Sequence, residues 1–332
     1  MVAGEDCGGT AGRIRGHMFI DPVAIQIGPI AIHWYGVMYV AAAIAAAWLA
    51  TREARRRGLD TDRVWTMLIV GGVGGIIGAR IYHVIHEWAF YSQNPELIPA
   101  VWNGGLGVPG GVAGGLVALA LYSRVNGLNL WRWLDVAAPA MLLAQAIGRI
   151  GNFINQELYG PPTDLPWGIP IDGEHRIPPW TNLDQYPVDS TRFHPLFAYE
   201  SVLNLIGVAV LLWVGRRYAR RLYDGDIALM YFIWYGSVRA VLETMRTGNW
   251  AVGGVPVAVI LGVGAAVTGA IAIIVRHARG WGTPGAFLRE TEAQEAEAEV
   301  AAEAMTSEGG PPGPLPEEPA TEPAASEESQ AG

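Results

Sequence analysis

The stretch VAAPAMLLAQAIGRIGNFINQELYG, residues 136–160, changes from apolar to polar at its middle. Its first nine residues are apolar enough to lie in lipid, but the next thirteen contain one arginine, two asparagines, two glutamines and one glutamate. Four of these polar residues are spaced i, i+4, i+7 and i+11, the spacing of one stripe along a helix: Gln145, Arg149, Asn152 and Gln156. Such a stripe on an apolar helix predicts a polar face that is turned away from lipid.

The composition of the whole chain supports a membrane protein. Of its 332 residues, 51% are hydrophobic and 16% are charged, whereas a soluble domain carries about 25% charged residues. From residue 281 onward the chain has twelve glutamates and one arginine, a net charge of −11 against −9 for the whole chain, so the first 280 residues carry +2. The acidic balance therefore belongs to the C-terminal segment and indicates neither an acidic nor a basic partner.

Seven segments are long and apolar enough to be membrane-spanning helices, which need about 20 residues each. They are residues 31–50, 64–83, 104–123, 135–156, 197–215, 227–246 and 251–275. The chain is therefore predicted to be an all-α polytopic membrane protein with seven transmembrane helices.

Arginine residues distinguish the loops between these segments. The loops after the first, third and fifth segments and the residues after the seventh contain five, two, four and two arginines, respectively. Residues 86–100 contain none, and residues 157–194 contain two among several acids. Because positive loops remain in the cytoplasm, this pattern predicts an outside N-terminus, seven crossings and a cytoplasmic C-terminus.

Three regions differ in composition. Residues 1–19 are a polar leader without the apolar run of a signal peptide, and they contain Cys7, the single cysteine, which excludes an internal disulfide. Residues 20–280 form the predicted membrane domain, in which the Pro-, Asp- and Gly-rich stretch 157–194 predicts an ordered extracytoplasmic loop or small head. Residues 281–332 are acidic and Pro-rich, which predicts a disordered cytoplasmic tail.

Polar residues also recur in other predicted spans. They are His33 and Tyr35 at the start of the first span; Arg80, His83 and Glu87 late in the second; His194, Tyr199 and Glu200 at the start of the fifth; and Tyr235, Arg239, Glu243 and Arg246 late in the sixth. With the predicted topology, all of these groups and the stripe lie in the outer half of the bilayer. The sequence therefore predicts one buried polar cavity that faces the outer leaflet.

The residue types in this cavity favour a phospholipid headgroup as its ligand. Arginine stays protonated, and its planar fork matches a phosphate group. The glycines of GGLGVPGGVAGG, residues 104–115, would let backbone N–H groups approach an anion. An arginine at the bilayer centre costs about 2.5–3.5 kcal/mol, so its presence favours a function.

Structural explanations remain for some of these residues. Arg239 and Glu243, spaced i, i+4, would also suit a purely structural ion pair. Arg80 lies near a helix end and could extend its charge to the membrane interface. His33 and His83 could lie at the interface without a role, and the glycines of the third span could serve helix packing.

The run GRIGNFINQELYG, residues 148–160, resembles the signature GR-x-GNF-x-N-x-E-x-(Y/W)-G of prolipoprotein diacylglyceryl transferases. Five further motifs of that family match in order: Ile32–Gly36, Gly78–Ile81, Trp102–Leu106, His194–Glu200 and Tyr235–Glu243. The resemblance covers about residues 20–278 and leaves out the leader and the acidic tail.

The resemblance implies a bacterial transferase of lipoprotein biosynthesis. Such an enzyme transfers the diacylglyceryl group of phosphatidylglycerol to the lipobox cysteine thiol of a preprolipoprotein, which forms a thioether and releases glycerol phosphate in the first step of lipoprotein maturation. The implied partners are phosphatidylglycerol and the preprolipoprotein signal peptide, with no nucleic acid. The implied location is the cytoplasmic membrane, with the site at its outer face. Neither a metal nor an organic cofactor is expected.

Roles for individual residues follow from the motifs. The expected catalytic residues are Arg149, Arg239, Glu157 and Tyr35. The residues expected to bind phosphatidylglycerol are Arg149, Asn152, Arg239, Glu243, Gly160, Arg80 and His194. The arginines would stabilise the developing charge of the leaving phosphate, and they would lower the pKa of the substrate thiol from its usual value of about 8.5.

One departure from the family concerns the general base. Many members have a histidine before the second glycine pair of the third-span motif, in a pattern like FHGG. Here the corresponding residues 108–111 read VPGG, and Pro109 cannot accept a proton. The remaining candidates for a base are Glu157, His194 and His33; alternatively, the arginines alone would generate the thiolate.

Two other function classes are compatible with an arginine-lined membrane cavity. A phospholipid or anion transporter would bind its substrate without chemistry, but it should also have polar residues in the inner half of the membrane. A structural membrane subunit would need no stripe suited to phosphate.

Overall fold

The computed structural model describes residues 20, 22–28, 30–249 and 251–308. The chain divides into two units, residues 1–288 and 289–332. All seven predicted spans lie in the first unit, and each is a helix over most of its length. The helices are α1 (Trp34–Arg56), α2 (Asp62–His86), α4 (Val108–Val125), α5 (Leu130–Ile154), α6 (Leu196–Arg217), α7 (Asp226–Glu243) and α8 (Val257–Arg279).

Six of these helices are long and apolar enough to cross a membrane, which makes the chain a helical multi-pass membrane protein. The exception among the seven is α7. It has 18 residues, of which Asp226, Arg239 and Glu243 carry charge. Neighbouring helices shield these charges, because α7 packs against α5, α6 and α8.

Short elements occupy the ends of the helices. They are strands β1 (Val23–Ile27) and β2 (Ile30–His33), helix α3 (Trp88–Tyr91), 3₁₀ turns at Pro95–Leu97, Val101–Asn103 and Gly173–His175, and strands β3 (Ala251–Val252) and β4 (Val255–Pro256). Each strand pair is an antiparallel hairpin, which the all-α prediction did not include. The first and seventh predicted spans therefore begin later than expected, after β2 and β4.

The third predicted span also begins later than expected. Gly104 and Gly105 have φ values of 80° and 69°, outside the range of an α-helix. Helix α4 starts at Val108, with Pro109 in its first turn. This position suits proline because the first N–H groups of a helix have no partner within the helix.

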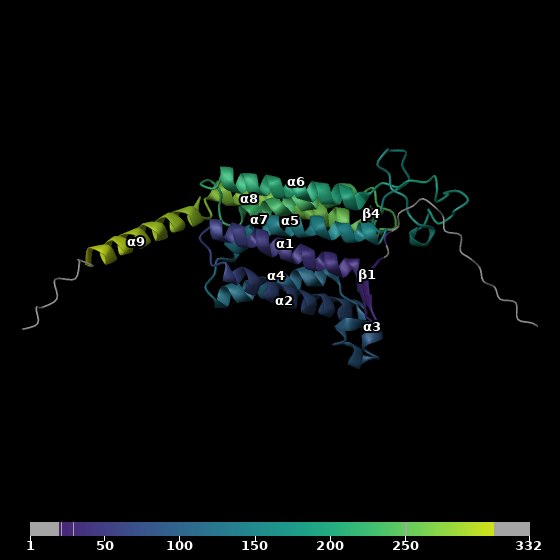
Figure 1. Cartoon of the computed structure of the whole chain (residues 1–332), viewed down its shortest axis with the longest axis horizontal. Coiled ribbons are helices and arrows are strands. Elements are labelled where there is room, and N and C mark those ends of the chain that lie inside the picture. Colours follow the sequence, from purple (N-terminus) through teal and green to yellow (C-terminus); the bar gives the residue numbers. More distant parts are fainter. Residues whose placement is uncertain (1–19, 21, 29, 250, 309–332) are drawn as a thin grey trace, which may run out of the picture. The chain divides into compact units, whose positions relative to one another are not determined.

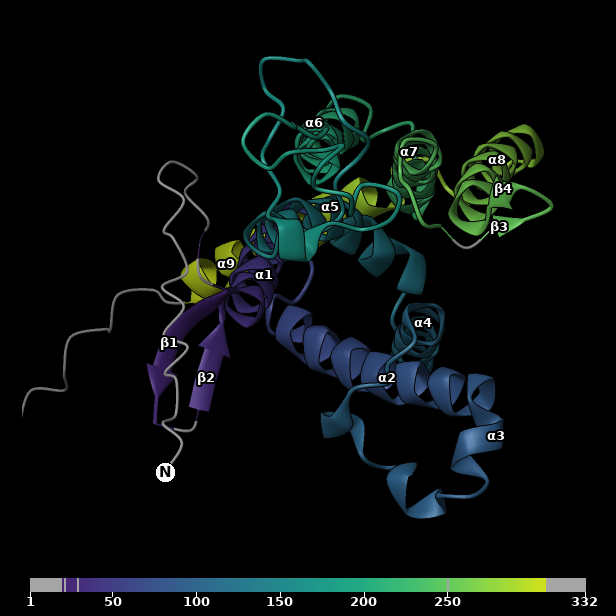
Figure 2. The same cartoon turned by 90° about the vertical axis from the view of Figure 1, so that its right-hand side faces the viewer.

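Helix α5 is the centre of the first unit. In its most apolar stretch of 18 residues, 44% of the stretch is buried, compared with 11% in the corresponding stretches of α4 and α8. It packs against α1, α6 and α7, while α2 and α4 form a close pair on another side (Figure 2). A Cβ atom on Gly78 of α2 would lie 2.3 Å from the carbonyl oxygen of Gly110 of α4. Small residues thus let these two helices touch through their backbones.

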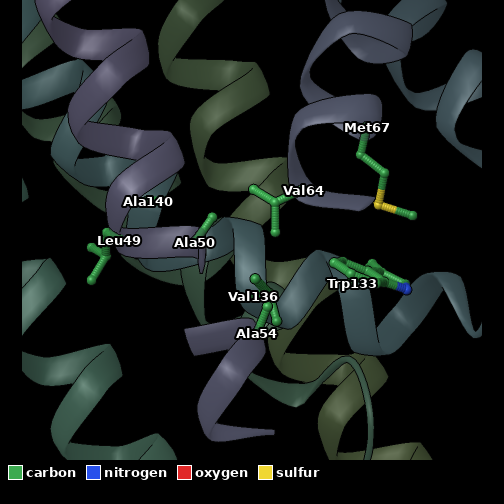
Figure 3. Close-up of a cluster of buried hydrophobic side chains, with 8 residues drawn as sticks. All are labelled: Leu49, Ala50, Ala54, Val64, Met67, Trp133, Val136 and Ala140. Atoms are coloured by element: carbon green, nitrogen blue, oxygen red, sulfur yellow. The ribbon is translucent and has the colours of Figure 1, made fainter. Parts of the chain in front are cut away.

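A buried apolar cluster joins α1, α2 and α5 near one end of the helices (Figure 3). Its members are Leu49, Ala50, Ala54, Val64, Met67, Trp133, Val136 and Ala140. They come from α1, α2 and α5, and Trp133 of α5 and Met67 of α2 are the largest side chains drawn. The cluster holds α2 to α1 and α5 at the end that carries the arginine-rich loops.

Buried ion pairs lie at the same end. Asp135 of α5 accepts a hydrogen bond from Arg57 at 3.3 Å and from the backbone N–H groups of Gly225 and Ala228, each at 2.9 Å. The fully buried Asp226 pairs with Arg276 at 3.3 Å and His277 at 2.7 Å. The expectation that all polar clusters lie in one half of the helices is therefore wrong. Sequence spacing did not reveal these pairs, because each joins residues from different helices or loops.

The other end of the helices carries both hairpins, α3 and the connection between α5 and α6 (Figure 1). This connection, residues 155–195, has its own small core of Tyr159, Ile171 and Phe193. Burial raises the pKa of the Tyr159 hydroxyl, which donates to the carbonyl of His175 at 3.1 Å and accepts from the N–H of Ile177 at 2.7 Å. We call residues 155–195 the head.

The terminal regions differ from the prediction in part. Disorder was predicted from residue 281, but helix α9 covers Ala286–Glu308. The described part of this region thus contains a charged helix, whereas residues 309–332 lie outside the described residues. The predicted leader 1–19 with Cys7 also lies outside them.

The ion pairs of Asp226 lead to a testable prediction about stability. Asp226→Asn keeps the shape of the side chain but removes the charge that balances Arg276. Breaking a buried ion pair by removing one partner should destabilise the fold by about 3 kcal/mol. The measurement is the melting temperature of the purified protein in detergent, which should fall clearly.

A matched control is Asp60→Asn. Asp60 pairs with Arg63 at 3.2 Å, but 55% of its side chain is exposed. Exposed pairs contribute about 0–1 kcal/mol, so this variant should melt close to the wild type. Equal melting temperatures for the two variants would contradict the structural importance of Asp226.

Candidate active site

The site begins at the end of α5 that adjoins the head. Arg149 donates a hydrogen bond to Asn152 at 3.0 Å and another to Glu200 of α6 at 2.5 Å. Glu200 is buried, with only 4% of its surface exposed. Arg149 therefore joins α5 to α6 through a buried, charge-assisted hydrogen bond.

Glu200 also binds the second arginine of the site. Its other carboxylate oxygen accepts from Arg239 of α7 at 3.3 Å. Arg239 in turn donates to Glu243, one turn further along α7, at 2.6 Å. One buried carboxylate thus holds Arg149 and Arg239 beside each other, as the sequence predicted for the two arginines.

Asn152 links this pair to the surface. Its amide donates to Glu157 at 2.7 Å while its oxygen accepts from Arg149. Glu157 is exposed, because it follows the end of α5. Tyr35 of α1 packs against the same part of α5, since a Cβ atom on Gly151 would lie 2.9 Å from the Tyr35 ring. The predicted residues Tyr35, Arg149, Asn152 and Glu157 therefore gather at one place.

The backbone after α5 is unusual. Gln156 and Leu158, on either side of Glu157, have φ values of 51° and 58°, which non-glycine residues rarely adopt. Gln156 therefore does not continue the helical stripe, and this part of the prediction is wrong. Its side-chain oxygen instead accepts from the N–H of Asp172 at 2.7 Å and ties α5 to the head.

Gly160 and His194 join the head to the start of α6. The N–H of Gly160 donates to the carbonyl of His194 at 2.9 Å, and a Cβ atom at Gly160 would lie 3.0 Å from the Cβ of His194. The His194 ring lies 3.1 Å from the hydroxyl of Tyr199, which also accepts from Trp167 at 2.8 Å. Neither predicted residue is bonded to the two arginines, and both hold the head against α6.

Arg80 lies apart from the other arginines. It is 6% exposed and donates to the carbonyls of Ile98 at 2.7 Å, Gly104 at 2.8 Å and Leu97 at 2.5 Å. Its guanidinium also lies over the ring of Tyr91, 5.1 Å from the centroid. With these contacts Arg80 holds the loop between α3 and α4, and its contact with a headgroup stays a prediction.

An open hollow lies beside Arg239 and Arg246, between the ends of α6 and α7 that adjoin the head. It is shallow and open to its surroundings, and it is lined by Leu158, Leu196, Phe197, Glu200, Arg239, Leu242, Glu243 and Arg246. The lining combines four apolar and four charged side chains, and α6 and α7 each contribute both kinds. This combination suits a lipid headgroup with its adjoining hydrocarbon.

Arg246, at the rim of this hollow, was noticed in the sequence but not assigned to the site. It lies beyond the end of α7, and its side chain is 35% exposed, compared with 20% for Arg239. Its ion pair with Glu243 is long, at 3.7 Å. Sequence reasoning also missed the central position of Glu200, although the HPLFAYE motif contains it. Only the packing of α6 between α5 and α7 places its carboxylate on both arginines.

The charges of the site cancel. Three arginines are linked through hydrogen bonds and ion pairs to three glutamates: Arg149, Arg239 and Arg246 to Glu157, Glu200 and Glu243. Within the described part of the chain, no group of three or more His, Cys, Asp or Glu lies close enough together to hold a metal ion.

The candidate base His33 lies away from α5, exposed at the end of β2. Pro109, which replaces the histidine of many relatives, is exposed in the first turn of α4. Among the described residues, Glu157 is the one predicted candidate that is hydrogen-bonded to a partner of the arginines, namely Asn152.

Comparisons with known proteins show the family of the chain. The family described as prolipoprotein diacylglyceryl transferase matches residues 22–275. A phosphatidylglycerol–prolipoprotein diacylglyceryl transferase of Chloroflexus aggregans is 44% identical over 272 residues, which cover 77% of this chain and 89% of that protein. Proteins of the same name from Geobacillus kaustophilus and Streptococcus uberis are 40% and 38% identical and cover 79% and 78% of this chain, and 94% and 96% of their own lengths.

The matched region contains every helix of the membrane domain except the last turn of α8, together with the head and all residues of the arginine network. The chain belongs to the prolipoprotein diacylglyceryl transferase family.

Proposed function

We propose that this protein transfers the diacylglyceryl group of phosphatidylglycerol to the lipobox cysteine of a preprolipoprotein. The single observation that carries the proposal is the buried Glu200, which binds both Arg149 and Arg239 and lines an open hollow together with Arg239. Family membership supplies the substrates. The thiol sulfur attacks the glyceryl carbon that bears the phosphate, the carbon–oxygen bond breaks, and glycerol phosphate leaves with the electron pair.

The arginines have the task of stabilising the leaving phosphate. Glu200 and Glu243 already accept bonds from Arg239, so the phosphate shares this residue rather than receiving it unpaired. Arg246 has more hydrogen-bonding capacity left for a phosphate than Arg239, because its ion pair is long and its side chain is partly exposed. We assign Arg246 to the first capture of the phosphate, and Arg149 and Arg239 to the charge that develops as the bond breaks.

Glu157 is the proposed acceptor of the thiol proton. Its hydrogen-bond partner is the neutral amide of Asn152, which leaves its second carboxylate oxygen available. Its exposed position, after the last turn of α5, suits a peptide substrate that arrives from outside. The rare backbone conformations on either side hold it there.

The protein is further proposed to cross the cytoplasmic membrane seven times, with the site at the outer face and α7 as the sixth span. The arginine-rich loops at the end opposite the head support this orientation. The acidic C-terminal segment is then cytoplasmic.

The first prediction concerns the arginines. Purified protein, phosphatidylglycerol with labelled acyl chains and a lipobox peptide should give a lipid-modified peptide. Arg149→Ala and Arg239→Ala should each lower kcat about 10²- to 10³-fold, because each removes a donor to the developing charge. Arg246→Ala should raise the KM for phosphatidylglycerol about tenfold with a smaller effect on kcat. Arg124→Ala, an exposed arginine at the opposite end of α4, is the matched control and should behave as the wild type.

Two results would contradict the proposal. Folded wild-type protein that gives no modified peptide would remove the transferase activity. If the same protein moved labelled phosphatidylglycerol between leaflets of a vesicle, a lipid transporter would take its place.

The second prediction concerns the base. Glu157→Gln should lower the transfer rate about 10²-fold or more, since it removes the proton acceptor but keeps a side-chain oxygen that accepts the hydrogen bond from Asn152. Glu174→Gln, an exposed glutamate of the head, should have no effect. Pro109→His, with Glu157 intact, should not raise the transfer rate, because a base is already present. Full activity of Glu157→Gln would exclude Glu157 as the base, and a gain in Pro109→His would show that a base had been missing.

The third prediction concerns topology. In a Cys7→Ser background, Ser92→Cys and Thr244→Cys should react in intact spheroplasts with a maleimide that does not cross membranes. Asn126→Cys and Arg221→Cys should react only after permeabilisation. All four positions are exposed in the fold. Labelling of Thr244 and Arg221 from the same side would show that α7 does not cross the membrane.

A further inference from the structure

A second polar layer lies one helical turn deeper than Arg149 and Glu200. Asn204 of α6 is 0% exposed, yet neither its side-chain oxygen nor its nitrogen has a hydrogen-bond partner among the described residues. The side-chain oxygen of Gln145 and the Nε of Arg149, both on α5, are also buried without a hydrogen-bond partner among the described residues. An unpaired polar group inside a membrane protein costs several kcal/mol, so such a set calls for a ligand.

Helix register places these groups together. Arg149 of α5 bonds to Glu200 of α6. Seven residues earlier on α5, Leu142 meets Gly207, seven residues later on α6, where a Cβ atom would lie 2.8 Å from the leucine. Gln145 lies between Leu142 and Arg149, and Asn204 lies between Glu200 and Gly207. All are at i, i+3 or i+4 spacings, so Gln145 and Asn204 face each other at one level of the interface.

Helix α7 closes this space from the side. The hydroxyl of Tyr231 accepts from the amide of Gln145 at 2.9 Å, and Trp234 donates to the carbonyl of Leu203 at 3.0 Å. Leu142 and Gly207 form the floor on the side toward the membrane centre. The groups with unused hydrogen-bonding capacity are therefore enclosed by three helices.

The chemistry of these groups matches one small ligand. Asn204 offers an N–H donor and an oxygen acceptor, Arg149 offers an Nε–H donor, and Gln145 offers an oxygen acceptor. Water accepts two hydrogen bonds and donates two, and buried waters have two to four polar partners. An ion would bring a net charge that two neutral amides cannot balance.

We propose that one water molecule is bound between α5 and α6 at Asn204 and Gln145, and that it fixes the guanidinium of Arg149 from behind. Asn204 is then a positioning residue for the transfer reaction. This second statement rests on the proposed function, whereas the binding of the water does not. Arg149 would be held at three points, by Glu200, by Asn152 and through the water, so that its donors stay aimed at the leaving phosphate.

The kinetic test uses Asn204→Leu, which has a similar volume but no hydrogen-bonding groups. The variant should insert, because leucine adds no polar group to the interface, and its melting temperature should fall only modestly, because Gln145 and Arg149 lose a partner. Its kcat should fall about 10- to 100-fold, with a smaller change in the KM for phosphatidylglycerol, since Arg149 loses one of its three supports. Asn204→Ser keeps a donor and an acceptor beside the water and should recover most of the rate.

The matched control is Ser201→Ala at the same helix interface. The hydroxyl of Ser201 donates to the carbonyl of Ala146 at 2.9 Å. Its loss removes a bond between α5 and α6 without touching the proposed water, so it should lower the melting temperature slightly and leave kcat unchanged. Wild-type kcat in Asn204→Leu, or an equal loss of rate in Asn204→Leu and Asn204→Ser, would overturn the positioning role.

A crystal structure of the full chain in a lipid phase, at a resolution that shows ordered waters, tests the site without any activity assay. Density for a water within hydrogen-bond distance of the Asn204 amide and the Nε of Arg149 is the expected result. A direct bond between the amides of Asn204 and Gln145, with no density between them, would overturn the proposal. Because this measurement does not need turnover, it separates failure of the water site from failure of the transferase function.

Discussion

The carboxylate of Glu200 is the interaction on which the rest of the site depends. Two guanidinium groups from α5 and α7 lie at a depth where an isolated charge is costly, and they would repel each other without a counter-ion between them. Glu200 accepts from both, at 2.5 Å from Arg149 and 3.3 Å from Arg239. It therefore sets the spacing of the arginines and, with them, the positions of three helices at the outer end of the domain.

The two ends of α5 use buried ion pairs for different purposes. At one end Asp135 is held by Arg57 and two backbone N–H groups, which leaves its carboxylate fully engaged and joins α1, α5 and the start of α7. Arg149 lies fourteen residues further along, about 21 Å at 1.5 Å per residue. At that end Glu157 keeps part of its hydrogen-bonding capacity, and so does Arg246, which lines an open hollow. The closed end stabilises the fold, and the open end can receive a ligand.

Much of the fold could be predicted from residue patterns, with errors where local chemistry overrides hydropathy. The seven apolar segments are helices, because their composition leaves the backbone no better way to satisfy its hydrogen bonds in lipid. Boundaries moved where Gly104 and Gly105 adopt positive φ values and where the hairpins precede α1 and α8. Gln156 left the helical stripe because α5 ends at Ile154, and nothing in a helical periodicity marks its own end.

The sequence by itself determined the membrane character of the chain, its family and the residue types of the site, since hydropathy, arginine placement and the GRIGNFINQELYG motif are local properties. Only the tertiary structure decided which charges meet. Arg80 and Arg149 look alike in sequence, yet Arg80 is bound by loop carbonyls and Arg149 by Glu200. The physical reason is that an ion pair between helices depends on how the helices pack, and partners 39 or 51 residues apart have no spacing rule that predicts them.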